Sequence, residues 1–285
     1  MSLESATDLQ QAVPDRVGHE VRVAKELTLR WGREVMDSPV GLGILLIAQP
    51  VIWYVLFGSL FGQLTQLPGF PVTSYRGYIL PGIVMLIALD YISTGGMCII
   101  DDIREGMLQK MWAAPISKLS IIAGRIVVMC LLSTLQIGFL LLLAYTDGVG
   151  IAAGLPGAAL LLMMSAAFTA GITALSLSLA YLFKHEFAFN AVTSFAILPV
   201  VFVSNAFVPI GLMPDWVAGV AAVNPVTITV TGLRALVLNG FVAADVVPAV
   251  VFLAAFDVGA VLLAALTFRL SIERESLFAD LCRFC

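Results

Sequence analysis

Long apolar runs alternate with shorter polar segments along most of this 285-residue chain. A helix that crosses a hydrocarbon layer of about 30 Å needs about 20 apolar residues, each rising about 1.5 Å. Six runs reach this length and predict six membrane-spanning helices. The runs are Val40–Phe61, Tyr78–Ile100, Ala123–Tyr145, Gly157–Leu182, Ala188–Phe207 and Ala243–Phe268. The expected fold class is an all-α membrane protein, with an N-terminal segment at 1–38, the spanning domain at 39–268 and a C-terminal tail at 269–285.

The polar segments predict how the chain is threaded through the membrane. Of the 15 Lys and Arg residues, all but Arg76 and Arg234 fall on one side of the six runs. Because basic residues are retained on the cytoplasmic side, we expect both termini in the cytoplasm and the protein in the cell membrane. The first 38 residues lack the basic start and short apolar core of a secretory signal, so the first run is expected to remain as an anchor.

The segment before the first run has an amphipathic pattern. From Gly18 to Asp37, apolar residues recur every three or four positions, and one of them is Trp31. This spacing predicts a helix that lies in the cytoplasmic membrane interface, where tryptophan favours the headgroup zone. The alternative is a simple solvated leader.

A second amphipathic segment lies between the second and third runs. Over Asp101–Ala114, Ile103, Met107 and Met111 form an apolar stripe, and charged or amide side chains cover the other face. The two aspartates suit a helix start, and Pro115 stops the helix. Helices of this kind either lie passively among lipid headgroups or dock into a groove on a soluble partner.

The last connection, Val208–Phe241, is long and apolar but is interrupted by three prolines. It is too broken for a clean span. We expect two short re-entrant helices that dip into the outer leaflet, because irregular backbone at that depth has to be covered by protein. For Arg234 in this connection we expect a structural ion pair, and a lipid headgroup is the alternative partner.

Polar side chains inside the runs are the candidates for a translocation path. Asp90 and Asp257 lie near the centres of the second and sixth runs, and an ionisable residue at such depth indicates function by default. The alternative for Asp90 is a structural hydrogen bond to Ser93, Thr94 or another neighbour between packed helices. Three amides are secondary candidates, with interhelical hydrogen bonding as their alternative role: Gln136, Asn190 and Asn205.

Composition limits the classes of function. The chain is 60% hydrophobic and 12% charged, with a net charge of −4 that argues against nucleic-acid binding. Cys282 and Cys285 form a C-x-x-C pair, but no further ligands accompany it, and the two His residues have no Cys or clustered acids at ligand spacing, so no metal site is expected. No G-x-x-x-x-G-K-[S/T] phosphate loop occurs, so the chain is not expected to hydrolyse ATP or hold a cofactor unaided.

Three motifs together resemble the permeases of type 2 ATP-binding-cassette exporters. "REGMLQKMWAAPIS" at 104–117 is similar to that family's coupling segment, although Met107 replaces the usual Thr and Gln109 the usual Glu. "QPVIWYVLFGSLFG" at 49–62 looks like its first span, and "NPVTITVTGLRALVLNG" at 224–240 resembles the signature before its last span. The matching positions are Arg104, Glu105, Gly106, Leu108, Pro115 and Ser117, then Pro50, Trp53, Phe57 and Gly58, then Asn224, Pro225, Thr227, Leu233 and Arg234.

The resemblance implies partners for this chain. A separate ATPase subunit in two copies would bind ATP and Mg²⁺ and would receive the coupling helix. A second permease copy, by default an identical one, would complete the path as a homodimer. The residues expected to contact the ATPase are Arg104, Glu105, Gly106, Met107, Leu108, Gln109, Met111 and Pro115.

The resemblance also implies a direction and a class of cargo. The daunorubicin-type drug exporters and the nodulation lipo-oligosaccharide exporters form the most similar subgroup. The cargo would be an amphipathic drug, a lipid or a lipid-linked saccharide, moved outward by alternating access. The alternative function is a proton-coupled secondary transporter that uses Asp90 and Asp257. An intramembrane enzyme is a third class, but no cluster of catalytic groups supports it.

Overall fold

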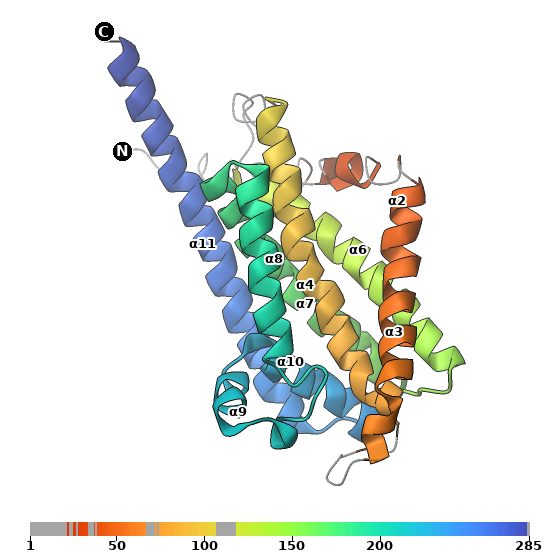
Figure 1. The fold of residues 1–285 in the computed structure, drawn as a ribbon. Coiled ribbons are helices and arrows are strands. Elements are labelled where there is room, and N and C mark those ends of the chain that lie inside the picture. Colours follow the sequence, from red (N-terminus) through yellow and green to blue (C-terminus); the bar gives the residue numbers. More distant parts are fainter. Residues whose placement is uncertain are drawn as a thin grey trace, which may run out of the picture.

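The computed structural model describes residues 22, 25–26, 28–33, 37, 39–66, 72, 74–106 and 118–283. The regular structure of these residues is helical throughout, and the long helices form a bundle (Figure 1). The elements in chain order are α2 (Pro39–Gly43), η1 (Ile44–Ala48), α3 (Gln49–Leu60), η2 (Gly62–Gln66), α4 (Tyr75–Arg104), α6 (Lys118–Thr146), α7 (Gly154–Phe183), α8 (Glu186–Phe202), η3 (Ile210–Leu212), α9 (Asp215–Ala222), α10 (Pro225–Arg234), η4 (Ala235–Asn239) and α11 (Ala243–Arg283).

The bundle has two distinct ends. We call the end where α2 starts, α4 stops and α8 starts the proximal end, and the end that carries α9 and α10 the distal end (Figure 1). Arg104 and Lys184 lie at the proximal ends of α4 and α7, whereas Arg76 lies at the distal start of α4 and Arg234 lies in the distal helix α10. This separation agrees with the predicted threading, while the side of the membrane that each end faces stays a prediction.

Five of the six predicted spans are confirmed as helices long and apolar enough to cross a membrane. They are Val40–Leu60, Tyr75–Arg104, Ser120–Thr146, Gly154–Phe183 and Ala243–Thr267. The fifth predicted span differs, because α8 has only 17 residues and ends at Phe202 instead of Phe207. That length is short of the roughly 20 residues that a span needs.

A side chain from a distant part of the sequence explains why α8 stops early. The Asn224 amide donates hydrogen bonds to the carbonyls of Val200 at 2.8 Å and Val203 at 2.6 Å. These bonds occupy carbonyls at the end of α8 that a further helical turn would use. The chain then continues into α9 and α10, which are bent by 81° relative to each other. The predicted pair of short helices is therefore present, and its depth in a membrane stays a prediction.

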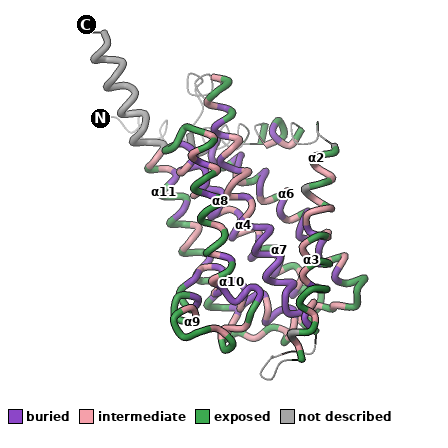
Figure 2. Tube along the Cα trace, viewed as in Figure 1, coloured by how far each residue is buried: buried purple, intermediate pink, exposed green. Residues whose placement is uncertain are grey.

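The core is built around α4. This helix contacts α3, α6, α7, α8 and α10, and Figure 2 shows its central turns as buried along with those of α7. Large apolar side chains on α6 and α8 face outward, for example Leu131 and Phe195. An apolar outer face and a buried centre are expected of helices that pack together in lipid.

The predicted helix over Asp101–Ala114 is wrong in its starting point. Asp101 and Asp102 belong to the last turn of α4, which continues to Arg104. Gly106 then adopts a φ of +66°, a left-handed conformation that commonly ends a helix. The other predicted contact residues of this segment lie outside the described residues: Met107, Leu108, Gln109, Met111 and Pro115.

Candidate functional site

Three segments meet at the proximal end around Arg125, near the start of α6. The Arg125 guanidinium donates from Nη2 to Asp102 Oδ2 at 2.6 Å, which joins α6 to the last turn of α4. The ring of Trp31 lies 3.8 Å from the guanidinium carbon of Arg125 on its other face. We call Trp31, Asp102 and Arg125 the proximal clamp. All three side chains are buried, so this clamp links the N-terminal segment to both helices that border the predicted coupling segment.

The clamp corrects one prediction and shows a site that sequence reasoning missed. Trp31 is 1% exposed and packs against Arg125, so it is not free to lie among lipid headgroups. A hydrogen bond from the Thr28 hydroxyl to the Gly124 carbonyl at 3.4 Å holds the same segment. The sequence feature that could have indicated this site is Arg125, because a charged residue inside a predicted span requires a partner.

A second polar pair at the proximal end is exposed. Arg104, the last residue of α4, forms an ion pair of 2.5 Å with Glu186 at the start of α8. An acid in the first turn of a helix is favoured by the helix dipole. Arg104 was predicted to contact an ATPase, and this intramolecular pair is its contact in the described structure.

The polar interior of the bundle brings two of the predicted path residues together. Asp90 of α4 accepts a hydrogen bond from the Gln49 amide of α3. Gln136 of α6 donates to the Gln49 oxygen at 3.1 Å and accepts from the Tyr91 hydroxyl at 3.1 Å. These four side chains, which we call the interior network, connect the start of α3 to the middle of α4 and to α6. The neighbour that bonds Asp90 is thus Gln49 rather than Ser93 or Thr94, and a hydrogen bond between packed helices, the structural alternative for Asp90, is present.

A π-helical turn positions Gln49, which the sequence analysis did not single out. The backbone N–H of Gln49 bonds to the carbonyl of Ile44, five residues earlier, at the end of η1. Such a turn inserts one extra residue and rotates the following side chains around the helix axis; π-turns are frequent at functional sites. An amide in an otherwise apolar run was the signal that could have identified Gln49.

Asp90 also lines a small cavity between α3, α4 and α8. The cavity has a volume of about 150 Å³. Apart from Asp90, its lining is apolar and includes Trp53, Phe57, Leu198 and Phe202. An ionisable group and a recess thus coincide at this point of the described bundle.

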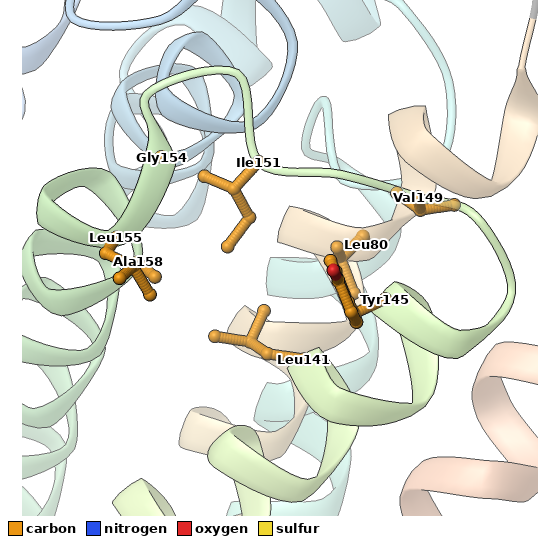
Figure 3. A pocket seen from close by; sticks show the side chains of 8 residues that line it. All are labelled: Leu80, Leu141, Tyr145, Val149, Ile151, Gly154, Leu155 and Ala158. Atoms are coloured by element: carbon orange, nitrogen blue, oxygen red, sulfur yellow. The ribbon is translucent and has the colours of Figure 1, made fainter.

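A larger cavity lies at the distal end between α4, α6 and α7, with a volume of about 480 Å³. Figure 3 shows its wall of aliphatic side chains, with Tyr145 as the residue that contributes a hydroxyl group. The lining has no charged side chain: Leu80, Leu141, Tyr145, Val149, Ile151, Gly154, Leu155 and Ala158. Its chemistry selects for apolar material without further specificity.

Asp257 and Asn190 make contacts other than the hydrogen bonds of the interior network. The Asp257 carboxylate of α11 fits a notch on α7 that Gly171 leaves open, since a Cβ there would overlap it. The Asn190 amide of α8 lies 3.8 Å from the Met97 sulfur of α4. Both residues therefore sit at helix contacts, and no hydrogen bond among the described residues joins Asp257 directly to Asp90.

The remaining predicted residues form a distal cluster around Arg234. The guanidinium carbon of Arg234 lies 3.8 Å from the ring of Tyr78, and its nitrogens donate to the carbonyls of Asn205 at 2.8 Å and Ala206 at 3.3 Å. The Asn205 amide in turn donates to the Thr231 hydroxyl at 2.9 Å. The expected ion pair is wrong, because carbonyl dipoles and an aromatic face satisfy Arg234 in place of an acid.

The distal cluster explains two further predicted residues. The Asn224 side chain accepts a hydrogen bond from the Val226 N–H at 2.9 Å and so caps the start of α10. Pro225 occupies the first helical position, where its missing N–H costs nothing. Asn224, Pro225 and Arg234 thus anchor α10 against α4 and α8, which is a structural role.

Replacing Arg234 by Lys is expected to lower the free energy of unfolding by about 1–3 kcal/mol. A lysine keeps the charge but cannot reproduce a planar fork that stacks on Tyr78 and reaches several carbonyls at once. Thermal unfolding of the purified protein in detergent measures the effect.

Arg76→Lys is the matched control. Arg76 pairs with Asp147 at 2.5 Å near the surface, where an ion pair contributes about 1 kcal/mol or less. Equal losses in the two variants would contradict a special role for the planar group of Arg234.

The arrangement as a whole defines a class of protein. Long apolar helices, an apolar outer face and a largely apolar core that encloses a small polar network indicate a multi-pass membrane protein. The family described as ABC-2 type transporter matches residues 27–238, which is most of the chain. The chain therefore belongs to the ABC-2 type transporter family.

Curated relatives agree with this membership. The chain is 30% identical over 198 residues to the putative transport permease ycf38 of Porphyra purpurea, covering 68% of this chain and 66% of the relative. It is 27% identical over 222 residues to the probable doxorubicin resistance ABC transporter permease protein DrrC of Mycobacterium tuberculosis, covering 75% of each. The chain thus spans just under two thirds of the length of the first of these relatives.

Proposed function

We propose that this chain is the membrane-spanning subunit of an ATP-driven exporter whose ATPase is a separate subunit. Membership of the ABC-2 type transporter family supports a permease role. A second permease copy would form a homodimer with it, in the cell membrane with both termini cytoplasmic. ATP and Mg²⁺ would bind to the partner ATPase, and this chain would supply the path for the cargo.

The observation that carries the coupling proposal is the proximal clamp. The segment at 105–117 leaves α4 three residues after Asp102 and enters α6 seven residues before Arg125. Because the buried Asp102–Arg125 pair joins these two helices, a displacement of the segment would move both helices together. Closure of an ATPase dimer against this segment would then be transmitted to the path as alternating access.

The proposal predicts that the permease stimulates ATP hydrolysis by its co-purified ATPase subunit in lipid. The double variant Glu105→Ala with Met107→Ala is expected to reduce this stimulation about tenfold or more, a loss of about 1.4 kcal/mol of coupling. Hydrolysis is measured as phosphate release with wild-type and variant permease at equal ATPase concentration.

Asp215→Ala is the control, since it removes one exposed acid at the start of α9 at the distal end. Its stimulation should match that of the wild type, and the melting temperature of every variant should be unchanged. Hydrolysis that is indifferent to the permease would overturn the exporter proposal. A proton-coupled carrier that uses Asp90 and Asp257 would then be the hypothesis to test, although no hydrogen bond among the described residues joins these two carboxylates directly.

The relative named for doxorubicin resistance supports an amphipathic cargo. A drug, a lipid or a lipid-linked saccharide fits the apolar interior, and daunorubicin-type and nodulation-type exporters remain the proposed subgroup. We propose Asp90 and Gln136, which share the interior network, as residues of the path. Asn190, Asn205 and Asp257 occupy helix contacts, so we propose them as supports of the path rather than as cargo contacts.

A further inference from the structure

Asp90 occupies an unusual position for a carboxylate. It is the sixteenth residue of the 30-residue helix α4, so by helical rise it lies roughly 22 Å from either end of that helix. A charged group at the middle of a bilayer is costly and normally has a partner. The interior network supplies only the neutral amide of Gln49.

The described residues provide no cation for Asp90. The three ion pairs among them use Asp147, Glu186 and Asp102 as acids. The cavity lining contains no Lys, Arg or His. No cationic side chain therefore balances the negative charge of the Asp90 carboxylate in this cavity. A ligand with complementary charge would be positively charged.

Aromatic rings surround the same cavity. The ring centroids of Trp53 and Phe57 are 5.1 Å apart, those of Phe57 and Phe207 5.0 Å, and those of Phe202 and Phe207 5.8 Å. All four side chains line the recess that holds Asp90. The face of an aromatic ring carries negative potential and attracts organic cations, most strongly where water is excluded.

The size of the cavity limits what enters it. Its volume of about 150 Å³ is enough for a benzene-sized group but not for a whole drug or lipid. Two lining side chains, Leu198 and Phe202, are 59% and 61% exposed, so the cavity opens on the outer surface of α8. A ligand can place its charged head inside and leave an apolar body against the outward face of the helices.

We propose that the Asp90 cavity recognises amphipathic cations, meaning hydrophobic amines or quaternary ammonium compounds. The cationic head binds between the Asp90 carboxylate and the rings of Trp53, Phe57, Phe202 and Phe207. This deepens the proposed function by naming the chemical class of the cargo, and it rests on that function only for the step of transport.

Binding can be measured without an ATPase. Purified full-length permease in lipid nanodiscs is titrated with diphenylhexatriene or with its trimethylammonium derivative, and energy transfer from tryptophan reports the bound probe. The two probes share one apolar body and differ in the charge. Each probe is compared with itself across variants, so partition into the lipid cancels.

Asp90→Asn is expected to weaken binding of the trimethylammonium probe about tenfold or more and to leave the affinity for the neutral probe unchanged. Phe57→Leu, which removes one ring, is expected to weaken the cation about threefold. Asp257→Asn is the matched control, because it makes the same change at an intramembrane acid outside the cavity.

Two results would overturn the proposal. Unchanged binding of the cation to Asp90→Asn would show that the carboxylate is not its site. Equal weakening of both probes would show that Asp90 only maintains the shape of the cavity. Charge-selective binding without ATPase stimulation would support the cation site and reject the exporter function. ATPase stimulation without charge-selective binding would support the exporter function and reject the cation site.

Discussion

Replacing Arg125 by Met is expected to lower the free energy of unfolding of the permease by about 3–5 kcal/mol. The substitution would leave the Asp102 carboxylate buried without its 2.6 Å partner and would remove the cation that packs on Trp31. Because the clamp joins α4, α6 and the N-terminal segment, the same variant should lose the ATPase stimulation of the proposed complex. Thermal unfolding in detergent and ATPase stimulation in lipid measure the two effects.

Two further variants distinguish the effect of breaking the proximal clamp from the effect of losing a positive charge. Arg104→Met breaks the exposed pair with Glu186 and is expected to cost about 1 kcal/mol or less. The double variant Asp102→Asn with Arg125→Met removes both buried charges and should recover much of the stability lost by Arg125→Met alone. If Arg104→Met and Arg125→Met were equally mild, the clamp would not be a principal joint of the proximal end.

Replacing Gly82 by Ala is expected to lower the free energy of unfolding by about 3 kcal/mol or more, at or above the upper end of ordinary overpacking. A Cβ at Gly82 would overlap the carbonyl oxygen of Ala206 and would lie 2.9 Å from its carbon. Both obstacles are backbone atoms, and α4 cannot retreat because it is the centre of the core. The Ala206 carbonyl also accepts a hydrogen bond from Arg234, so the distal cluster would be displaced with it.

Gly138→Ala provides the comparison, since Gly138 lies on α6 with no atom within 4 Å of an added Cβ. Alanine is favoured over glycine in a helix by up to about 1 kcal/mol, so this variant should be neutral or slightly more stable. Thermal unfolding of both variants under one condition tests the contrast. A Gly82→Ala protein as stable as the wild type would mean that the 203–209 segment can move away from α4.

The residue types predicted individual members of the candidate sites but did not predict which side chains contact one another. Asp90 and Gln136 were identifiable as polar residues in apolar runs, yet their shared partner Gln49 depends on a π-turn and on how α3 packs between α4 and α6. Arg234 was expected to pair with an acid. Its carbonyl partners come from residues 28, 29 and 156 positions away in the chain, so only the folded chain brings them within reach.

The sequence by itself determined that this is a helical membrane protein and where most of its helices run. A helix satisfies its backbone hydrogen bonds between residues four positions apart, and its apolar surface is a property of the same segment. Both requirements are local, so they are visible in a run of about 20 residues. The motif resemblance added the family for the same reason, because its residues are contiguous.

Only the tertiary structure decided where α8 stops, which side chains meet and where a cavity forms. Asn224 ends α8 from 21 and 24 residues away, Arg125 reaches Asp102 across 23 residues, and the Asp90 cavity is shared by three helices. These features depend on the rotation and approach of whole helices, which many weak contacts set together. No local sequence pattern encodes the combined effect of these contacts. For this reason the interior network, the proximal clamp and the Asp90 cavity became visible only in the packed bundle.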